Sequence, residues 1–277
     1  MELIVAYTTD GQYALIPVTV ENGETYVYTE YGKGRQLEID EEDFPTLAST
    51  GLHSEEELDQ TETITGKPIS KITADGRPGG LSSEGFMGKE EDIISVLKGD
   101  NRLVGKMGLT HPEMARPLFH VWNAVLKMAE TYGDRGRPWD NLDYLLYNGR
   151  KVYLRARGTK GLQKSIFDDE IQGGYHIYIH RELDQKEKEL LSRHYSHLDA
   201  RQVEEFIKKL SHIHTGEMEP YYVMRYGFYE GHTDYRVDPI AMVFMFGLRD
   251  LEDIESAFSG RLDKALTGHH TKESVSN

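Results

Sequence analysis

The sequence predicts an α+β fold with an antiparallel, hairpin-rich sheet and with helices concentrated in the C-terminal half. Three observations predict it. Alternating and β-branched residues dominate the start of the chain, tight-turn dipeptides such as Asn148-Gly149 separate consecutive segments, and apolar residues recur at helical spacing after residue 184. No internal repeat or heptad array interrupts this pattern.

The first segment is expected to form a β-meander with strands at residues 3–8, 12–20, 24–31 and 35–39. Asp10-Gly11 and Asn22-Gly23 lie between strands and supply the positive-φ residues that tight hairpins require. A stretch rich in Gly, Ser and Pro at residues 64–88 is expected to connect the meander to the rest of the chain. We therefore predict a meander subdomain at 1–66, a main α+β domain at 67–267 and a frayed tail at 268–277.

The main domain is expected to be mixed, with strands and helices that pack on them. Strands are predicted at residues 144–147, 151–157, 174–181 and 221–229, and helices at 90–98 and 110–133 and after Asp184, Asp199, Asp238 and Asp250. The helix over 240–246 is apolar all round and must be buried. His212 and His214 are placed in the last turn of a helix, which argues against a His-x-His metal site, because such a site needs an extended chain.

Composition excludes several classes of function. The chain has 277 residues, a formal net charge of −15 and no cysteine, which rules out disulfides, thiolate nucleophiles and cysteine-bound zinc. The negative balance makes nucleic acid an unfavourable partner and suits a basic protein partner. The longest apolar run, residues 239–248, is about half of the ~20 residues that a membrane span needs. We expect a cytoplasmic protein with no membrane contact, since no secretory signal opens the sequence.

The stretch EGHTDYRVD, residues 230–238, is the first candidate site. In an extended chain Glu230, His232, Asp234, Arg236 and Asp238 would share one face. Asp238 is explained as the N-cap of the following helix, and Arg236 as a counter-charge or substrate anchor. Glu230, His232 and Asp234 remain as candidate catalytic acid and base groups. No metal site is predicted, because the interleaved arginine would compete with a cation.

Two further strands carry candidate binding residues. Alternation in YHIYIHR puts His176, Tyr178 and His180 on one face, as in a pocket wall or a solvated outer face. Six cations and no acid lie between residues 149 and 167, and Arg155 and Arg157 share a strand face with Tyr153. Such a face can bind phosphate or a nucleotide, or its cations can pair with the many acids elsewhere in the chain.

The loop RPGGLSSEGF, residues 77–86, joins Arg77 to two adjacent glycines and to Ser82 and Ser83. Backbone amides in such a loop can cradle an anion. It matches neither the phosphate-loop pattern nor the dinucleotide glycine pattern, and a mobile linker is the favoured description of this loop.

Two functions fit the sequence. The first is a hydrolase for a phosphorylated or otherwise anionic small molecule, with Glu230, His232 and Asp234 as catalytic groups. Its substrate would be held by residues of three segments, namely Arg155, Arg157, Arg236, Tyr178, His176 and His180. The alternative is a non-catalytic interaction or ligand-binding protein with an acidic, tyrosine-rich surface. The sequence contains no cofactor motif, so the identity of any cofactor stays open.

Overall fold

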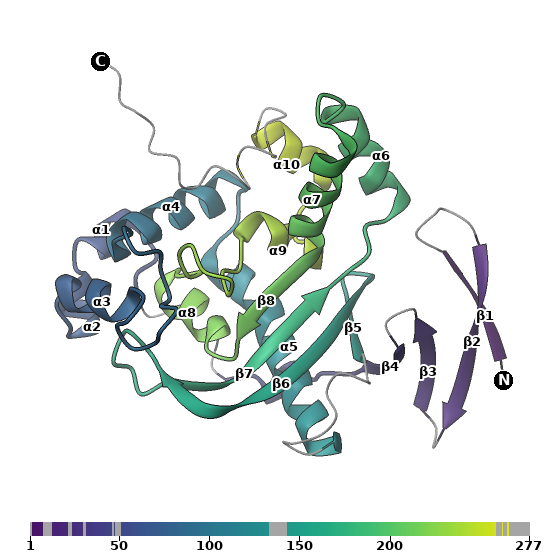
Figure 1. Ribbon diagram of the computed structural model, residues 1–277, viewed down its shortest axis with the longest axis horizontal. Helices are drawn as coiled ribbons and strands as arrows, with labels where there is room; N and C mark the ends of the chain where they lie inside the picture. The colour runs from purple at the N-terminus through teal and green to yellow at the C-terminus, as the bar shows by residue number, and fades with distance from the viewer. Residues whose placement is uncertain are drawn as a thin grey trace.

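The computed structural model (Figure 1) describes residues 2–7, 13–21, 24–29, 32–45, 47, 51–132, 143–258, 262 and 265. Side chains are described from residue 35 onward, with residue 160 excepted. The predicted α+β class is confirmed. The dipeptides Asp10-Gly11 and Asn22-Gly23 and the predicted tail lie outside the described residues.

The strands form one sheet in sequence order, and every neighbouring pair is antiparallel except β4 and β5. The first four strands are the predicted meander. The strands are β1 (Glu2–Tyr7), β2 (Tyr13–Glu21), β3 (Glu24–Thr29), β4 (Gly32–Leu37), β5 (Asp143–Tyr147), β6 (Arg150–Lys164), β7 (Gln172–His180) and β8 (His212–Gly216). The Asn148-Gly149 turn joins β5 to β6 as predicted, with both residues at positive φ.

The helices fall into two groups along the chain, one before β5 and one after β7. The first group is the 3-10 helix η1 (Glu41–Asp43), α1 (Glu55–Leu58), α2 (Thr61–Thr65), α3 (Ile69–Gly76), α4 (Ile93–Lys106) and α5 (His111–Tyr132). The second is α6 (Gln185–His194), α7 (Ala200–Ser211), α8 (Glu219–Tyr226), α9 (Pro239–Phe246) and α10 (Leu251–Ala257). Within the described residues, no helix has the length and apolarity that crossing a bilayer requires.

Four local predictions are wrong. The helix expected at residues 90–98 begins at Ile93 and continues through Gly99 to Lys106 as α4. The expected connection at residues 64–88 is partly helical, and it includes α3. Residues 221–226 belong to α8 and residues 227–229 follow it without forming a strand, because Pro220 lies in the first turn of that helix and Gly227, at φ 62°, ends it. The chain at residues 212–214 is extended rather than helical, since β8 pairs with β7 and buries Ile213 on its inner side.

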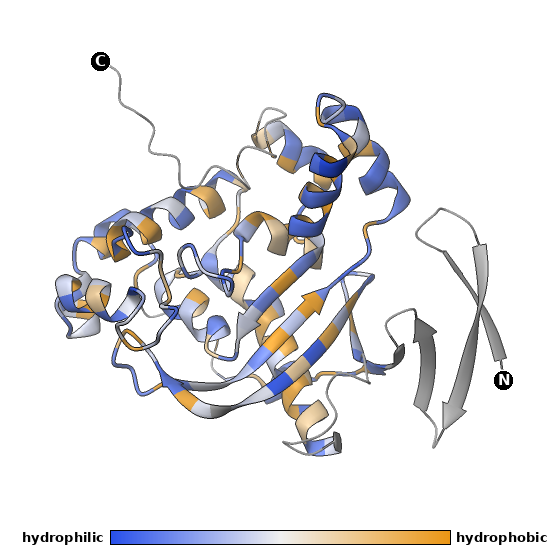
Figure 2. Ribbon diagram, in the orientation of Figure 1, coloured by the Kyte–Doolittle hydropathy of each residue, from blue (hydrophilic) through white to orange (hydrophobic). Residues whose placement is uncertain are grey.

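The main core lies between the sheet and two helices. Alternate residues of β6, β7 and β8, among them Leu154, Ile179 and Ile213, pack against α5 and α9 (Figure 1). Figure 2 shows the resulting alternation of hydrophobic and hydrophilic residues along these strands. Since one face of the strands is core, their other face presents the polar and aromatic residues that concern the site.

A second core cluster joins α1, α3 and α4 with α8 and with residues 166–167. The meander is linked to the main core by Leu37, which packs in the main cluster, and by the buried Arg35–Asp143 ion pair at 3.1 Å. The proposed division between residues 66 and 67 stays a prediction.

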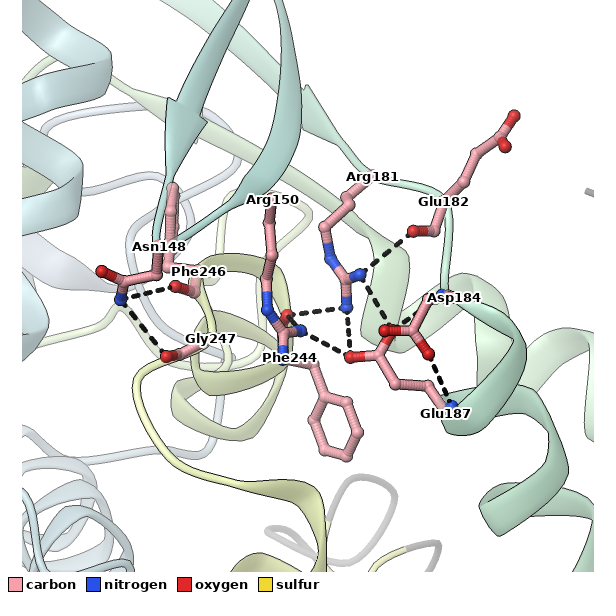
Figure 3. Close-up of polar contacts among 9 residues, drawn as sticks. All are labelled: Asn148, Arg150, Arg181, Glu182, Asp184, Glu187, Phe244, Phe246 and Gly247. Carbon is pink, nitrogen blue, oxygen red and sulfur yellow. Dashed lines mark hydrogen bonds and ion pairs between the residues drawn. The ribbon is translucent and has the colours of Figure 1, made fainter. Parts of the chain in front are cut away.

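Helix α9 is buried at every residue, as its composition predicts, so both of its ends need partners inside the protein. At the N-terminus, the Asp238 carboxylate accepts hydrogen bonds from the N–H groups of Ile240 and Ala241. At the C-terminus, the carbonyl of Phe244 accepts hydrogen bonds from Arg150 and Arg181 (Figure 3).

Glu187 of α6 holds the two arginines together. Its Oε1 lies 2.5 Å from Nη1 of Arg150, and its two oxygens accept hydrogen bonds of 2.8 Å from Arg181 (Figure 3). The Glu187 side chain is 5% exposed. A buried carboxylate between two guanidinium groups thereby orients both donors toward α9.

Replacing Glu187 with alanine should lower the free energy of unfolding by about 3–5 kcal/mol, because two cations lose their buried partner. Urea unfolding followed by circular dichroism measures the change. The control is Glu189→Ala on the exposed side of the same helix, which should stay within about 0.5 kcal/mol of wild type. Equal effects of the two substitutions would contradict this account.

Candidate functional site

The segment after α8 does not form the predicted strand. Residues 227–238 run through bends and a turn, and Glu230 adopts a left-handed conformation at φ 59°. Two backbone hydrogen bonds fix the segment, from Gly231 N–H to the Phe86 carbonyl at 2.8 Å and from Val237 N–H to the Tyr229 carbonyl at 3.1 Å. The predicted alternation of side chains on one face is therefore wrong.

The three predicted catalytic residues are separated as a result. Glu230 is buried, and its Oε2 accepts a 2.6 Å hydrogen bond from the hydroxyl of Thr233. His232 lies at the surface, with its Nδ1 3.1 Å from Oε1 of Glu91. Asp234 is exposed and lines a different hollow. The prediction that these residues form one row is thus corrected, and only Glu230 enters a buried site.

Arg236 is a counter-charge with a buried partner. Its guanidinium donates to both carboxylate oxygens of Asp100, at 2.6 and 3.3 Å, and to the backbone carbonyl of Glu230. Asp100 comes from α4, so this ion pair ties the segment 227–238 to a distant helix. Although burial opposes the charged form, the carboxylate of Asp100 raises the pKa of Arg236 above its ordinary value.

Glu219, the first residue of α8, was not found from the sequence. It is 1% exposed, and within the described residues its buried Oε1 accepts no hydrogen bond. Burial raises its pKa well above the ordinary value, and the neighbouring Glu230 adds to the shift. Burial likewise raises the pKa of Glu230 to about 8. The pair therefore retains at least one proton at neutral pH.

Both carboxyl groups line a cavity of about 350 Å³, here called the acid cavity. Its walls come from residues 81–86, 159, 161–163, 173, 175–176, 216–219, 230 and 235. Glu84 and Glu217 also line it, and burial raises the pKa of Glu217. The predicted anion cradle at residues 77–86 forms part of this acidic wall. Arg77 is engaged elsewhere, donating to the Glu91 carbonyl at 2.8 Å.

A tyrosine and a histidine complete the acid cavity. The hydroxyl of Tyr235 is hydrogen-bonded to Nδ1 of His176, and both residues line the cavity. Burial raises the pKa of Tyr235 to about 12, so its hydroxyl keeps a proton to donate. Burial, assisted by Arg157, lowers the pKa of His176, so its imidazole is neutral at physiological pH. The cavity thus combines a proton donor with a neutral base.

A second hollow of about 700 Å³ lies on the polar face of β7 and β8 and is here called the basic groove. Four of the predicted anion-binding residues line it: Arg155, Tyr178, His180 and Arg236. His176 instead lines the acid cavity, and Arg157 lies opposite His176 in the β6–β7 register. Glu205, Lys208 and Lys209 of α7 and His212 and His214 of β8 also line the groove.

Rings stack across the strands between the two hollows. Tyr178 and His214 are parallel to within 4°, with ring centroids 4.2 Å apart, and His214 packs against Tyr235 at 4.2 Å. Tyr235 also contacts His176, so the stack borders the groove on one side and the acid cavity on the other. Within the described residues, no group of three or more His, Asp or Glu side chains has metal-binding geometry.

Comparisons with known protein families, curated proteins and solved structures find no match to this chain. The arrangement of the described residues is therefore the only basis for a functional proposal.

The carboxyl pair should make stability fall with rising pH. Burial raises the pKa of both carboxyls above the ordinary 4.5, so the folded pair retains at least one proton that the unfolded chain has lost, and the folded state loses stability as pH rises toward about 8. Buried histidines with a lowered pKa make stability rise with pH instead, but only below about pH 6.5, where the unfolded chain binds protons that the folded state does not. Between pH 6.5 and 8, we expect a fall of about 1.4 kcal/mol per pH unit for each retained proton.

Urea unfolding at several pH values tests this expectation. The free energy of unfolding should fall less steeply with rising pH in Glu219→Gln and in Glu230→Gln, because each substitution removes a titrating carboxyl. Glu56→Gln, at an exposed position of α1, should keep the wild-type slope. If the free energy of unfolding depends on pH in all three variants as it does in the wild-type protein, the two carboxyls do not retain their protons in the folded state.

Proposed function

We propose that this protein is a hydrolase whose general acid is the buried Glu219–Glu230 pair. The observation that carries the proposal is the sharing of one cavity by two buried carboxyl groups, one of which has an oxygen that accepts no hydrogen bond from the described residues. Such a pair is costly to bury, and a pKa raised toward neutrality is what a general acid needs. A purely structural carboxyl would be expected to have its hydrogen-bonding capacity satisfied.

In the proposed reaction, the protonated carboxyl pair donates its proton to the leaving-group oxygen as the bond to that oxygen breaks. A water molecule forms the new bond to the electrophilic centre and gives its proton to His176. Neutral imidazole takes up this proton at Nε2, which requires the tautomer in which Nδ1–H donates to the hydroxyl oxygen of Tyr235 and so holds the ring. A proton returns from the imidazole to the carboxyl through solvent and completes the cycle.

The lining of the acid cavity favours a neutral or positively charged reacting group. Four glutamates line it, Glu84, Glu217, Glu219 and Glu230, and its described lining residues include neither Lys nor Arg. Among the described lining residues, a phosphate group inside this cavity would meet carboxyl groups and no cation. Any anionic part of the substrate, as proposed from the sequence, would have to lie outside the acid cavity.

The proposal is tested with chromogenic glycosides, carboxylic esters and phosphomonoesters. We expect turnover of a neutral substrate, and a decrease in kcat/KM of at least about 100-fold in Glu219→Gln and in Glu230→Gln, the range for loss of a general acid or base. Glu56→Gln, at the surface of α1, is the matched control and should keep wild-type kinetics.

The dependence of kcat/KM on pH should have a basic limb that reflects the carboxyl pair, with activity lost as pH rises past the raised pKa. Absence of turnover by the wild-type protein, or wild-type rates in both glutamine variants, would overturn the proposal. An activity confined to phosphomonoesters would contradict the inference from the cavity lining.

A further inference from the structure

Two exposed leucines from distant segments border the acid cavity. Leu81, in the loop at residues 77–86, is 40% exposed, and Leu162 of β6 is 70% exposed. A single exposed leucine is common, but two beside one cavity offer an apolar surface to a ligand. The buried side chains of Phe86 and Met218 line the same cavity and continue this surface inward.

Glycines of β7 fix the wall that these side chains form. Gly173 lines the cavity, and a Cβ atom there would lie 2.9 Å from Cγ of Met218 and 3.2 Å from Cγ of Glu217. At Gly174, a Cβ atom would lie 3.0 Å from Cδ2 of Leu162. The three side chains therefore pack directly on the strand backbone, and an apolar group and a carboxyl group are held beside one another.

The four carboxyl groups of the cavity lie at different depths. Glu84 is exposed and Glu217 is half-buried, whereas Glu219 and Glu230 are buried. Among the described residues, Oε1 of Glu219 accepts no hydrogen bond, so a ligand group can complete the hydrogen bonding inside the cavity. A ligand that enters meets Glu84 and Glu217 before it reaches the buried pair.

The cations that act on this region lie outside the described lining. Arg236 acts on Glu219, but it is paired with Asp100. Arg157 acts on the imidazole of His176, which it faces across β6 and β7. Within the described lining, the outer carboxyl groups therefore have no cation beside them, and a positively charged ligand group is complementary to them.

We propose that the acid cavity binds a primary amine that carries an apolar group. The ammonium group donates hydrogen bonds to the carboxylates of Glu84 and Glu217. The apolar group packs against Leu81 and Leu162. The volume of about 350 Å³ lies within the range of pockets for small organic ligands.

This inference names the substrate class of the proposed hydrolase, and it rests on that proposal only for the reaction, because binding breaks no bond. The ammonium group occupies the outer carboxyls and leaves the Glu219–Glu230 pair free to protonate the leaving group. An amine that cannot be hydrolysed therefore tests binding separately from turnover.

Isothermal titration calorimetry of the full chain with phenethylamine, which is protonated at neutral pH, tests the inference. We expect saturable binding. Phenethyl alcohol, which lacks the charge, and ethylamine, which lacks the ring, should each bind at least about tenfold more weakly. In NMR spectra of protein labelled with ¹³C at methionine methyl groups, phenethylamine should change the signal of Met218 and not that of Met242, which is buried in α9.

Paired substitutions test the carboxylates. The variant Glu84→Gln/Glu217→Gln should weaken binding of phenethylamine by about tenfold or more. The variant Glu56→Gln/Glu90→Gln makes the same charge change at two exposed positions and should alter binding by less than about twofold.

A leucine substitution tests the apolar contact. Leu162→Ser should weaken binding of phenethylamine by at least about threefold and leave that of ethylamine unchanged. Leu146→Ser, at a 54% exposed position of β5, should alter neither.

Absence of saturable binding of phenethylamine, or equal affinity for phenethyl alcohol, would overturn the inference. Equal effects of the two paired glutamine variants, or of the two serine variants, would overturn it as well. The catalytic proposal is judged by turnover of neutral substrates and by Glu219→Gln and Glu230→Gln, so its failure is distinguishable from failure of amine binding.

Discussion

The Arg236–Asp100 ion pair is the constraint on which both hollows depend. It joins the irregular segment 227–238 to α4, and the same guanidinium holds the backbone carbonyl of Glu230. Glu230 is therefore kept at a positive φ, which costs a residue with a side chain about 1–3 kcal/mol and persists only where the surroundings fix it. Backbone hydrogen bonds from Gly231 to Phe86 and from Val237 to Tyr229 hold the flanking residues, and the guanidinium of Arg236 donates to the Glu230 carbonyl itself.

The charge balance of this buried region also explains the carboxyl pair. Asp100 already neutralises Arg236, so the guanidinium offers little further compensation to Glu219 and Glu230. Two more carboxylates cannot both ionise beside it in a region of low dielectric constant, and they bind protons instead. The chemistry proposed for the acid cavity thus follows from an excess of buried acids over buried cations.

The sequence predicts those elements whose signals are local. Asn148-Gly149 identifies the β5–β6 turn, Asp238-Pro239 the start of α9, and Thr110 with Glu113 the start of α5, where the glutamate accepts a 2.8 Å hydrogen bond from the Thr110 N–H. Helix α1 also begins with a local signal, the capping box of Ser54 and Glu57, which the acidic composition of that region obscured. The alternating polar face of β7 was predicted correctly, because strand alternation is also a local signal.

The site is less predictable because it depends on contacts between distant segments. The aromatic pattern of residues 221–229 suits a strand equally well, and only Pro220 and Gly227 reveal the helix. That error hid Glu219, whose importance arises from burial rather than from any motif. The row at 230–238 was interpreted from strand periodicity, whereas Asp100, more than a hundred residues away, decides its shape.

The central claim is that burial keeps the Glu219–Glu230 pair protonated at neutral pH. Infrared spectroscopy of protein labelled with ¹³C at glutamate carboxyl groups measures this directly, because protonated carboxyl and carboxylate groups absorb at different frequencies. At pH 7 we predict a protonated-carboxyl band that is lost in the Glu219→Gln/Glu230→Gln double variant. If the wild-type protein at pH 7 shows only carboxylate bands, the central claim is wrong.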